Sequence, residues 1–154
     1  MKTQHLQRLD PPEGAETPAR EDAPIRVVVV DDDDSVRAAL ITLLDHHGAF
    51  RVVAHATDGA YAPSLVAKLR PDVVVIDVRM PIVSGIDALA LIRKVDRDVR
   101  VVMLSAYGDD ALVTDAIAAG ASGYLVKGCS AEQLFATLEQ AHRTRTYTRT
   151  EQDD

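Results

Sequence analysis

The chain has 154 residues, 47% of them hydrophobic and 27% charged, which suits one globular domain with a substantial core. Its formal net charge of −7 argues against a nucleic-acid-binding surface, and no stretch has the length or flanking residues of a signal peptide or membrane span. With a single cysteine, Cys129, the chain cannot form an internal disulfide. We therefore expect a cytoplasmic protein that binds neither nucleic acid nor membranes directly.

Both ends of the chain are expected to be tails. Residues 1–24 mix charges with several prolines and show no hydrophobic periodicity. Such a segment cannot bury enough apolar surface to offset the entropy lost on ordering. Residues 143–154 are polar, with alternating threonine and arginine at their start. One folded domain is therefore predicted at residues 25–142.

The first predicted strand leads into a run of acidic residues. Residues 25–30 are mostly β-branched, which indicates a buried strand, and residues 31–34 are four consecutive aspartates. Asp34 or Ser35 is expected to cap the helix that follows. Residues 51–56 predict a second strand.

The helix expected after the second strand contains a proline. With Asp58 as its cap, Pro63 would lie beyond the first turn and would remove a helical hydrogen bond. The regular helix is therefore expected to start near Ala62 or to be kinked.

The third predicted strand, residues 73–77, organises the rest of the chain. Its first four residues are all apolar, so they cannot alternate between core and solvent, and the strand must be covered on both faces. The strand ends on a carboxylate, Asp77. A helix capped at Ser84 is expected to follow and to run to about Val95.

Two further strands end on residues with reactive or charged side chains. Residues 99–105 end at the hydroxyl of Ser105, and residues 123–126 are followed directly by Lys127. Asp109 is the expected cap of the intervening helix, and Ser130 opens the last one with a capping box. The residues expected to face inward from the intervening helix are Val113, Ala116 and Ile117.

Alternating strands and helices predict the α/β class, in a flavodoxin-like doubly wound (βα)5 arrangement with parallel strand order 2-1-3-4-5. In such sheets the ligand crevice lies outside the carboxyl ends of the strands, at the switch point between the first and third strands. That topology brings Asp31 and Asp32 together with Asp77. Clustered carboxylates raise one another's pKa unless a cation is present, and few protein ligands with retained waters suit Mg²⁺.

The same residues carry a resemblance to a known family. The chain resembles the receiver domain of bacterial response regulators in two-component signalling, over roughly residues 25–142. The matching motifs are Val30-Asp31-Asp32 followed by Val36-Arg37, Ile76-Asp77-Val78-Arg79-Met80-Pro81 with Gly85, Leu104-Ser105-Ala106, and Gly123-Tyr124-Leu125-Val126-Lys127.

The resemblance implies a role for each matching residue. Asp77 would accept a phosphoryl group from a sensor histidine kinase. Mg²⁺ would be bound by Asp32, Asp77 and the Arg79 carbonyl, with Asp31 acting through water. The groups that would hold the phosphoryl oxygens are Ser105 and Lys127.

The resemblance also implies a switch that catalyses its own phosphorylation and slow self-dephosphorylation. Phosphorylation would draw Ser105 inward and let Tyr124 turn, which alters the face formed by the helix after residue 109, the strand 123–126 and the last helix. We expect no output domain after the last helix of this sequence, which could be a stand-alone receiver or part of a longer regulator. We therefore expect the signal to leave through this face, to a downstream protein or to a second copy of the chain.

Three alternatives compete with this interpretation. A pseudo-receiver would bind a partner without phosphorylation, but such domains typically lack the acid pair or the lysine, and this chain has both. A phosphatase of the haloacid-dehalogenase plan needs a second aspartate where this chain has Arg79. Dinucleotide binding fails because four aspartates follow the first strand where glycines would be needed.

The resemblance further implies that two bulky residues control how long the phosphoryl group lasts. The side chains two beyond the acceptor and two beyond Ser105 are Arg79 and Tyr107. Hydrolysis needs a water in line with the Asp77–phosphorus bond, and neither side chain is a good base at neutral pH. Slow self-dephosphorylation is therefore predicted.

Overall fold

The computed structural model describes residues 23–106 and 110–144. Five parallel strands form one sheet in the order β2-β1-β3-β4-β5, which confirms the predicted flavodoxin-like topology. The strands are β1 (Ile25–Val30), β2 (Phe50–Ala56), β3 (Val73–Asp77), β4 (Arg100–Ser105) and β5 (Gly123–Val126).

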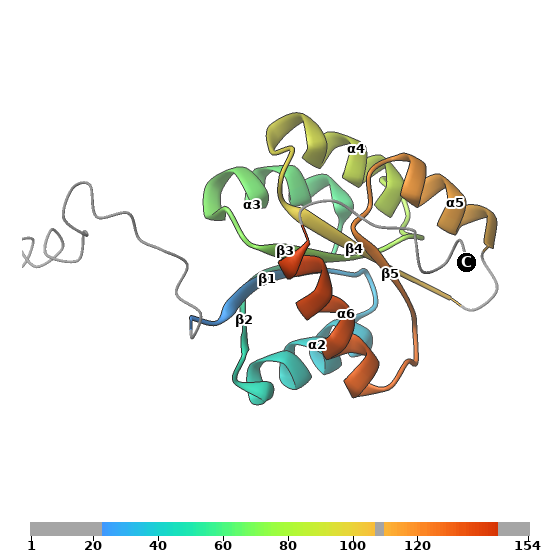
Figure 1. Ribbon diagram of the computed structural model, residues 1–154. Coiled ribbons are helices and arrows are strands. Elements are labelled where there is room, and N and C mark those ends of the chain that lie inside the picture. The colour runs from blue at the N-terminus through green and yellow to red at the C-terminus, as the bar shows by residue number, and fades with distance from the viewer. Residues whose placement is uncertain (1–22, 107–109, 145–154) are drawn as a thin grey trace, which may run out of the picture.

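Helices cover both faces of this sheet (Figure 1). On one face lie α2 (Asp34–His47) and α6 (Ala131–Arg143); on the other lie α3 (Ala62–Leu69), α4 (Gly85–Val95) and α5 (Asp110–Ala118). A short 3₁₀ helix, η1 (Gly59–Tyr61), precedes α3. Within the described ranges, no helix is long and apolar enough to cross a membrane.

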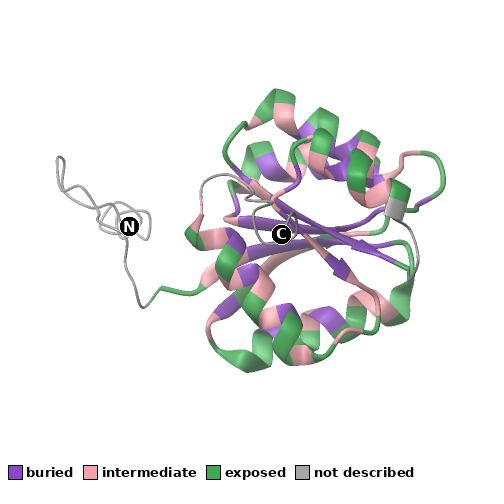
Figure 2. Ribbon diagram, turned by 45° about the vertical axis from the view of Figure 1, so that its right-hand side comes forward, coloured by how far each residue is buried: buried purple, intermediate pink, exposed green. Residues whose placement is uncertain are grey.

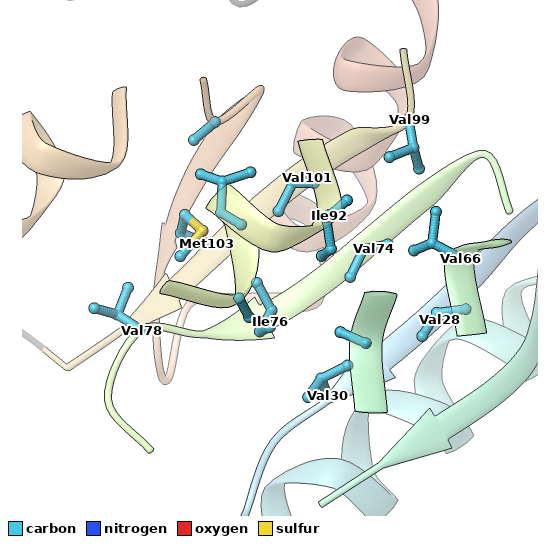
Figure 3. Packing of buried hydrophobic residues seen from close by; sticks show 14 of the residues in the cluster. Val28, Val30, Val66, Val74, Ile76, Val78, Ile92, Val99, Val101 and Met103 are labelled. Atoms are coloured by element: carbon cyan, nitrogen blue, oxygen red, sulfur yellow. The ribbon is translucent and has the colours of Figure 1, made fainter. Parts of the chain in front are cut away.

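The strands are buried because their side chains pack into two hydrophobic cores, one on each face of the sheet. Val28 and Val30 belong to the cluster beneath α3 and α4, whereas Val27 and Val29 belong to the cluster beneath α2 and α6. Figure 2 shows the buried strands between helices whose outer surfaces are exposed. Figure 3 shows the first cluster, in which side chains from β1, β3 and β4 lie near Val66 and Ile92 of the covering helices.

The edge strand β2 carries an irregularity. Val27 of β1 pairs with Val52, but the next residue, Val28, pairs with Ala54. Val53 is therefore an extra residue in β2, a bulge of the kind that increases local twist.

The helix starts agree with the sequence expectations in part. Helix α3 begins at Ala62 with Pro63 in its first turn, as predicted, and Asp58 caps the preceding 3₁₀ turn. The predicted cap of α2 at Asp34 or Ser35 was wrong by one residue. Asp33 has the extended backbone of a cap, and its carboxylate accepts hydrogen bonds from the amides of residues 35 and 36.

Helix α5 is turned slightly from the orientation that its sequence suggested. Ala116 is buried as expected, but Leu112 and Ala119 are the side chains that pack against the core. The other residues predicted to face inward, Val113 and Ile117, are partly buried, as are Leu112 and Ala119. The predicted cap, Asp109, lies outside the described residues.

Candidate functional site

The parallel sheet brings the predicted site residues to one edge. Asp77 is the last residue of β3, and Ser105 is the last residue of β4. Asp31 follows β1 directly, and Lys127 follows β5 directly. Since all five strands run in the same direction, their carboxyl ends lie together, and so do these four side chains.

Asp77 and Lys127 form an ion pair at the centre of this edge. The Lys127 ammonium donates a hydrogen bond to Asp77 Oδ2 at 2.9 Å, and the backbone amide of Arg79 donates to Asp77 Oδ1 at 3.2 Å. Asp77 is only 3% exposed. Burial alone would lower the pKa of Lys127, but the hydrogen bond and charge of Asp77, with the charge of Asp31, outweigh it and raise that pKa.

Asp31 is fully buried beside this pair. Its Oδ1 accepts a hydrogen bond from the amide of Asp33 at 2.9 Å. Its Oδ2 has no hydrogen-bond partner among the described residues, and Lys127 Nζ lies 3.6 Å away. Burial is the largest effect on the pKa of Asp31 and raises it, whereas the hydrogen bond from the Asp33 amide lowers it. The charge of Asp77 raises the pKa again, and the weaker effects of Lys127 and Asp32 oppose each other, so the pKa stays raised.

Asp32 completes a cluster of three carboxylates. It is exposed, whereas Asp31 and Asp77 are buried, and each of the three offers an oxygen within 4.8 Å of the others. A hard divalent cation takes oxygen ligands of this kind. The buried Asp31 Oδ2 without a hydrogen bond supports this assignment, because an unpaired buried acceptor is costly unless a cation or water meets it. The cluster can therefore hold a metal ion.

Ser105 lies beside Asp77 and is coupled to Lys127 through the backbone. It is 1% exposed, and its hydroxyl donates to the carbonyl of Ala106 at 3.2 Å. The carbonyl of Ser105 accepts a hydrogen bond from the amide of Lys127 at 2.8 Å. A displacement of the end of β4 would therefore be transmitted to Lys127.

The structure places the remaining predicted residues less centrally. Tyr124 of β5 is half-buried and packs against the core beneath α3 and α4. Arg79 is exposed and borders a cavity of about 420 Å³. The other residues lining that cavity are Val78, Met80, Pro81, Ser84, Ile86 and Leu112. Tyr107 lies outside the described residues, so its expected role stays a prediction.

Arg37 and Gly85 lie near the site, although the sequence motifs that contain them assign neither residue a role. Arg37 donates to the carbonyl of Asp31 and to the carboxylate of Asp34, and the three-residue spacing of Asp34 and Arg37 on a helix was the available signal. Gly85 lies so close to the backbone that an added Cβ would be 2.2 Å from the carbonyl oxygen of Asp77. The sequence around Gly85 does not show that this residue lies against the Asp77 carbonyl.

Comparison with known proteins gives a consistent result. The family model described as response regulator receiver domain matches residues 27–139. The transcriptional regulatory protein LnrK of Bacillus subtilis is 36% identical over 118 residues, which cover 77% of this chain and 54% of LnrK. The chain thus spans about half the length of this and similar curated relatives.

Solved structures show the same fold. The receiver domain of the putative response regulator NarL from Mycobacterium tuberculosis is 34% identical, with a TM-score of 0.74 over 79% of this chain and 99% of that one. A complex of CheX and CheY with BeF3 and Mg²⁺ from Borrelia burgdorferi contains a chain that is 28% identical. Its TM-score is 0.74, over 79% of this chain and 92% of that one.

Proposed function

The chain belongs to the response-regulator receiver family, and we propose that it accepts a phosphoryl group from a sensor histidine kinase on Asp77 in a Mg²⁺-dependent step. One observation carries this proposal. A nearly buried carboxylate at the end of the central strand is paired with an ammonium, and one of its oxygens lies within 4.8 Å of oxygens of two further carboxylates. A carboxylate with only a structural role would not need the two additional acids.

The donor set of the cluster fits Mg²⁺. Mg²⁺ prefers oxygen ligands and retains several waters, so a few carboxylates suffice. Asp32, Asp77 and the Arg79 carbonyl would hold the ion, with Asp31 acting through water. Bound there, Mg²⁺ would supply positive charge to the phosphoryl oxygens. The CheY complex that contains BeF3 and Mg²⁺ supports this assignment by similarity.

Asp77 is the nucleophile in the proposed transfer. One of its oxygens forms a bond to phosphorus, while the bond from phosphorus to the kinase histidine breaks and its electron pair passes to the imidazole nitrogen. A carboxylate attacks an anionic phosphoryl group poorly unless positive charge is supplied. Lys127, now 2.9 Å from Asp77 Oδ2, needs only a short movement to reach a phosphoryl oxygen. Ser105 donates a further hydrogen bond from its hydroxyl.

The output would follow from the charge that phosphorylation adds. An acyl phosphate brings about −1.5 to −2 charge, next to the buried hydroxyl of Ser105. As Ser105 is drawn in, space opens for the half-buried Tyr124, and the face formed by α5, β5 and α6 changes. A downstream protein or a second copy of the chain binds this altered face. Residues 25–142 form the working unit, in the cytoplasm where the kinase's phosphodonor domain is available.

Mass spectrometry tests the proposal directly. The chain is incubated with acetyl phosphate or phosphoramidate, with Mg²⁺ or with EDTA. The expected result is the mass gain of one phosphoryl group in Mg²⁺ only, lost in Asp77→Asn and retained in Asp98→Asn, which changes an exposed carboxylate. Labelling of Asp77→Asn at the level of wild type would refute the acceptor assignment. A chain that is never labelled but still binds a partner would instead be a pseudo-receiver.

A further inference from the structure

Arg37 of α2 holds the loop that connects β1 to α2. Its Nη1 donates to the backbone carbonyl of Asp31 at 2.7 Å, and its Nη2 donates to the carboxylate of Asp34 at 2.6 Å. The Arg37 side chain is 12% exposed, whereas that of Asp34 is 86% exposed. An exposed carboxylate thus orients a nearly buried guanidinium, which gives the carbonyl a charge-assisted hydrogen bond.

The carbonyl that Arg37 holds belongs to the peptide leading into Asp32. The same short segment is fixed on its other side, because the amide of Asp31 donates to the carbonyl of Ala56 at 3.1 Å. Asp32 itself is exposed, so packing does little to hold its side chain. The direction of its carboxylate therefore depends on how the Asp31–Asp32 peptide is oriented.

We infer that Arg37 is a positioning residue for Asp32. By holding the Asp31 carbonyl, it fixes the peptide from which the Asp32 carboxylate projects toward the metal site. The inference rests on the proposed function, because it takes Mg²⁺ binding by the carboxylate cluster as given. Groups that orient metal ligands from outside typically change metal affinity by about 10- to 100-fold when removed. Asp34 shares the role, since it orients the guanidinium.

If Arg37 acted only through its charge, removing it would strengthen Mg²⁺ binding and not weaken it. The guanidinium is a positive charge close to the carboxylate cluster, and it repels a metal cation. A neutral replacement would make the cluster more negative and would tighten Mg²⁺ binding. If Arg37 positions Asp32, binding weakens despite that gain. The sign of the change in affinity therefore separates the two effects.

The experiment titrates the full chain with Mg²⁺ alone and follows backbone amides 31–33 and 77 by ¹H–¹⁵N NMR. The variants are Arg37→Gln, Arg37→Lys and Arg51→Gln. Arg51 is exposed at the amino end of β2, away from the site, so its replacement removes the same charge without touching the loop. Arg37→Lys keeps the charge, but a lysine lacks the planar fork that reaches two acceptors.

The expected result is Mg²⁺ binding about 10-fold weaker in Arg37→Gln, also weaker in Arg37→Lys, and unchanged in Arg51→Gln. A second readout is the rate of phosphorylation by acetyl phosphate as a function of Mg²⁺ concentration. The half-saturating Mg²⁺ concentration should rise in the Arg37 variants while the rate at saturating Mg²⁺ is retained. A general loss of folded protein would lower the saturating rate instead.

Arg37→Gln that binds Mg²⁺ as tightly as wild type, or more tightly, overturns the inference. If the dispersion of its amide signals shows that Arg37→Gln does not fold, Arg37→Lys decides the question in the same terms. A wild-type chain that binds no Mg²⁺ overturns the proposed metal site itself. Wild-type binding with unchanged Arg37 variants overturns only the positioning role.

Discussion

Lys127 Nζ lies 2.9 Å from Asp77 Oδ2, so the ammonium neutralises one oxygen of the carboxylate that is proposed to accept the phosphoryl group. The contact joins the ends of β3 and β5, which are not neighbours in the sheet. In the proposed cycle, the same ammonium must leave the carboxylate for a phosphoryl oxygen. In that cycle Lys127 would respond directly to the phosphorylation of Asp77.

Lys127→Ala should separate metal binding from switching. Mg²⁺ binding should be at least as tight as in wild type, because the competing cation has been removed from Asp77 and Asp31. Phosphorylation should no longer change amide hydrogen exchange in α5 and β5. Isothermal titration with Mg²⁺ and exchange measured with and without acetyl phosphate check both parts. A normal exchange response in the variant would remove Lys127 from the signalling path.

Asp32→Ala and Asp33→Ala should have opposite patterns of effect. Asp32 belongs to the carboxylate cluster, so its loss should weaken Mg²⁺ binding by about 10-fold or more with little effect on stability. Asp33 caps α2, so its loss should cost about 1 kcal/mol of unfolding free energy with little effect on Mg²⁺ binding. Urea unfolding and Mg²⁺ titration of both variants provide the comparison. Equal effects of the two substitutions on Mg²⁺ affinity would contradict the assignment of Asp32.

Asp31→Asn should stabilise the metal-free protein at neutral pH. Burial raises the pKa of Asp31 above its ordinary value of 3.8, so the ionised form is disfavoured in the folded state. This penalty is absent below pH 3.8 and grows as the pH rises toward the pKa in the folded protein. The asparagine side chain should therefore raise the free energy of unfolding by about 1 kcal/mol at pH 7. Below pH 3.8 it should have no effect.

Thermal unfolding in EDTA across this pH range measures the effect of Asp31→Asn, with Asp98→Asn as the control for an exposed carboxylate. A gain that is the same at every pH would mean that ionisation of Asp31 is not its cause. Excess Mg²⁺ should reduce the advantage of the variant, because the ion compensates the buried charge only in wild type.

Gly85→Ala should damage the site through the backbone. The added Cβ would lie 2.2 Å from the carbonyl oxygen of Asp77 and 2.8 Å from the Cα of Val78, and neither atom can move without displacing β3. We expect a loss of about 1–3 kcal/mol in unfolding free energy and slower phosphorylation. Gly123→Ala is the matched control, since its Cβ would make only an ordinary 3.4 Å contact with Thr137. Similar losses in both variants would argue against a specific clash at Asp77.

Arg79→Asn should shorten the lifetime of the phosphorylated state. Arg79 is exposed two residues after Asp77 and borders a cavity. We propose that its bulk and charge hinder the water that hydrolyses the acyl phosphate. An exposed charged contact of this kind is worth about 2- to 5-fold in rate. Loss of phosphate from wild type, Arg79→Asn and Tyr107→Glu in Mg²⁺ buffer tests the idea. If the rate of phosphate loss is unchanged in both variants, these two positions do not control access of water to the acyl phosphate.

The sequence predicted the site well wherever topology alone determines position. Asp77 and Ser105 end their strands, and Asp31 and Lys127 directly follow theirs, so a parallel sheet places all four at one edge. The cap of α2 was misplaced because Asp33, Asp34 and Ser35 are all good caps, and only the backbone conformation of Asp33 distinguishes them. The contacts of Arg37 depend on how the chain turns after β1, which side-chain spacing does not specify.

The bulge at Val53 has a consequence for the behaviour of the chain at high concentration. An open sheet exposes unpaired amides and carbonyls along its outer strands, and another chain can extend it there. The irregular register in β2 twists one outer strand out of the flat shape that such an addition requires. The other outer strand, β5, has only four residues. Strand-to-strand aggregation is therefore disfavoured at both borders of the sheet, even though its interior is almost entirely valine, isoleucine and leucine.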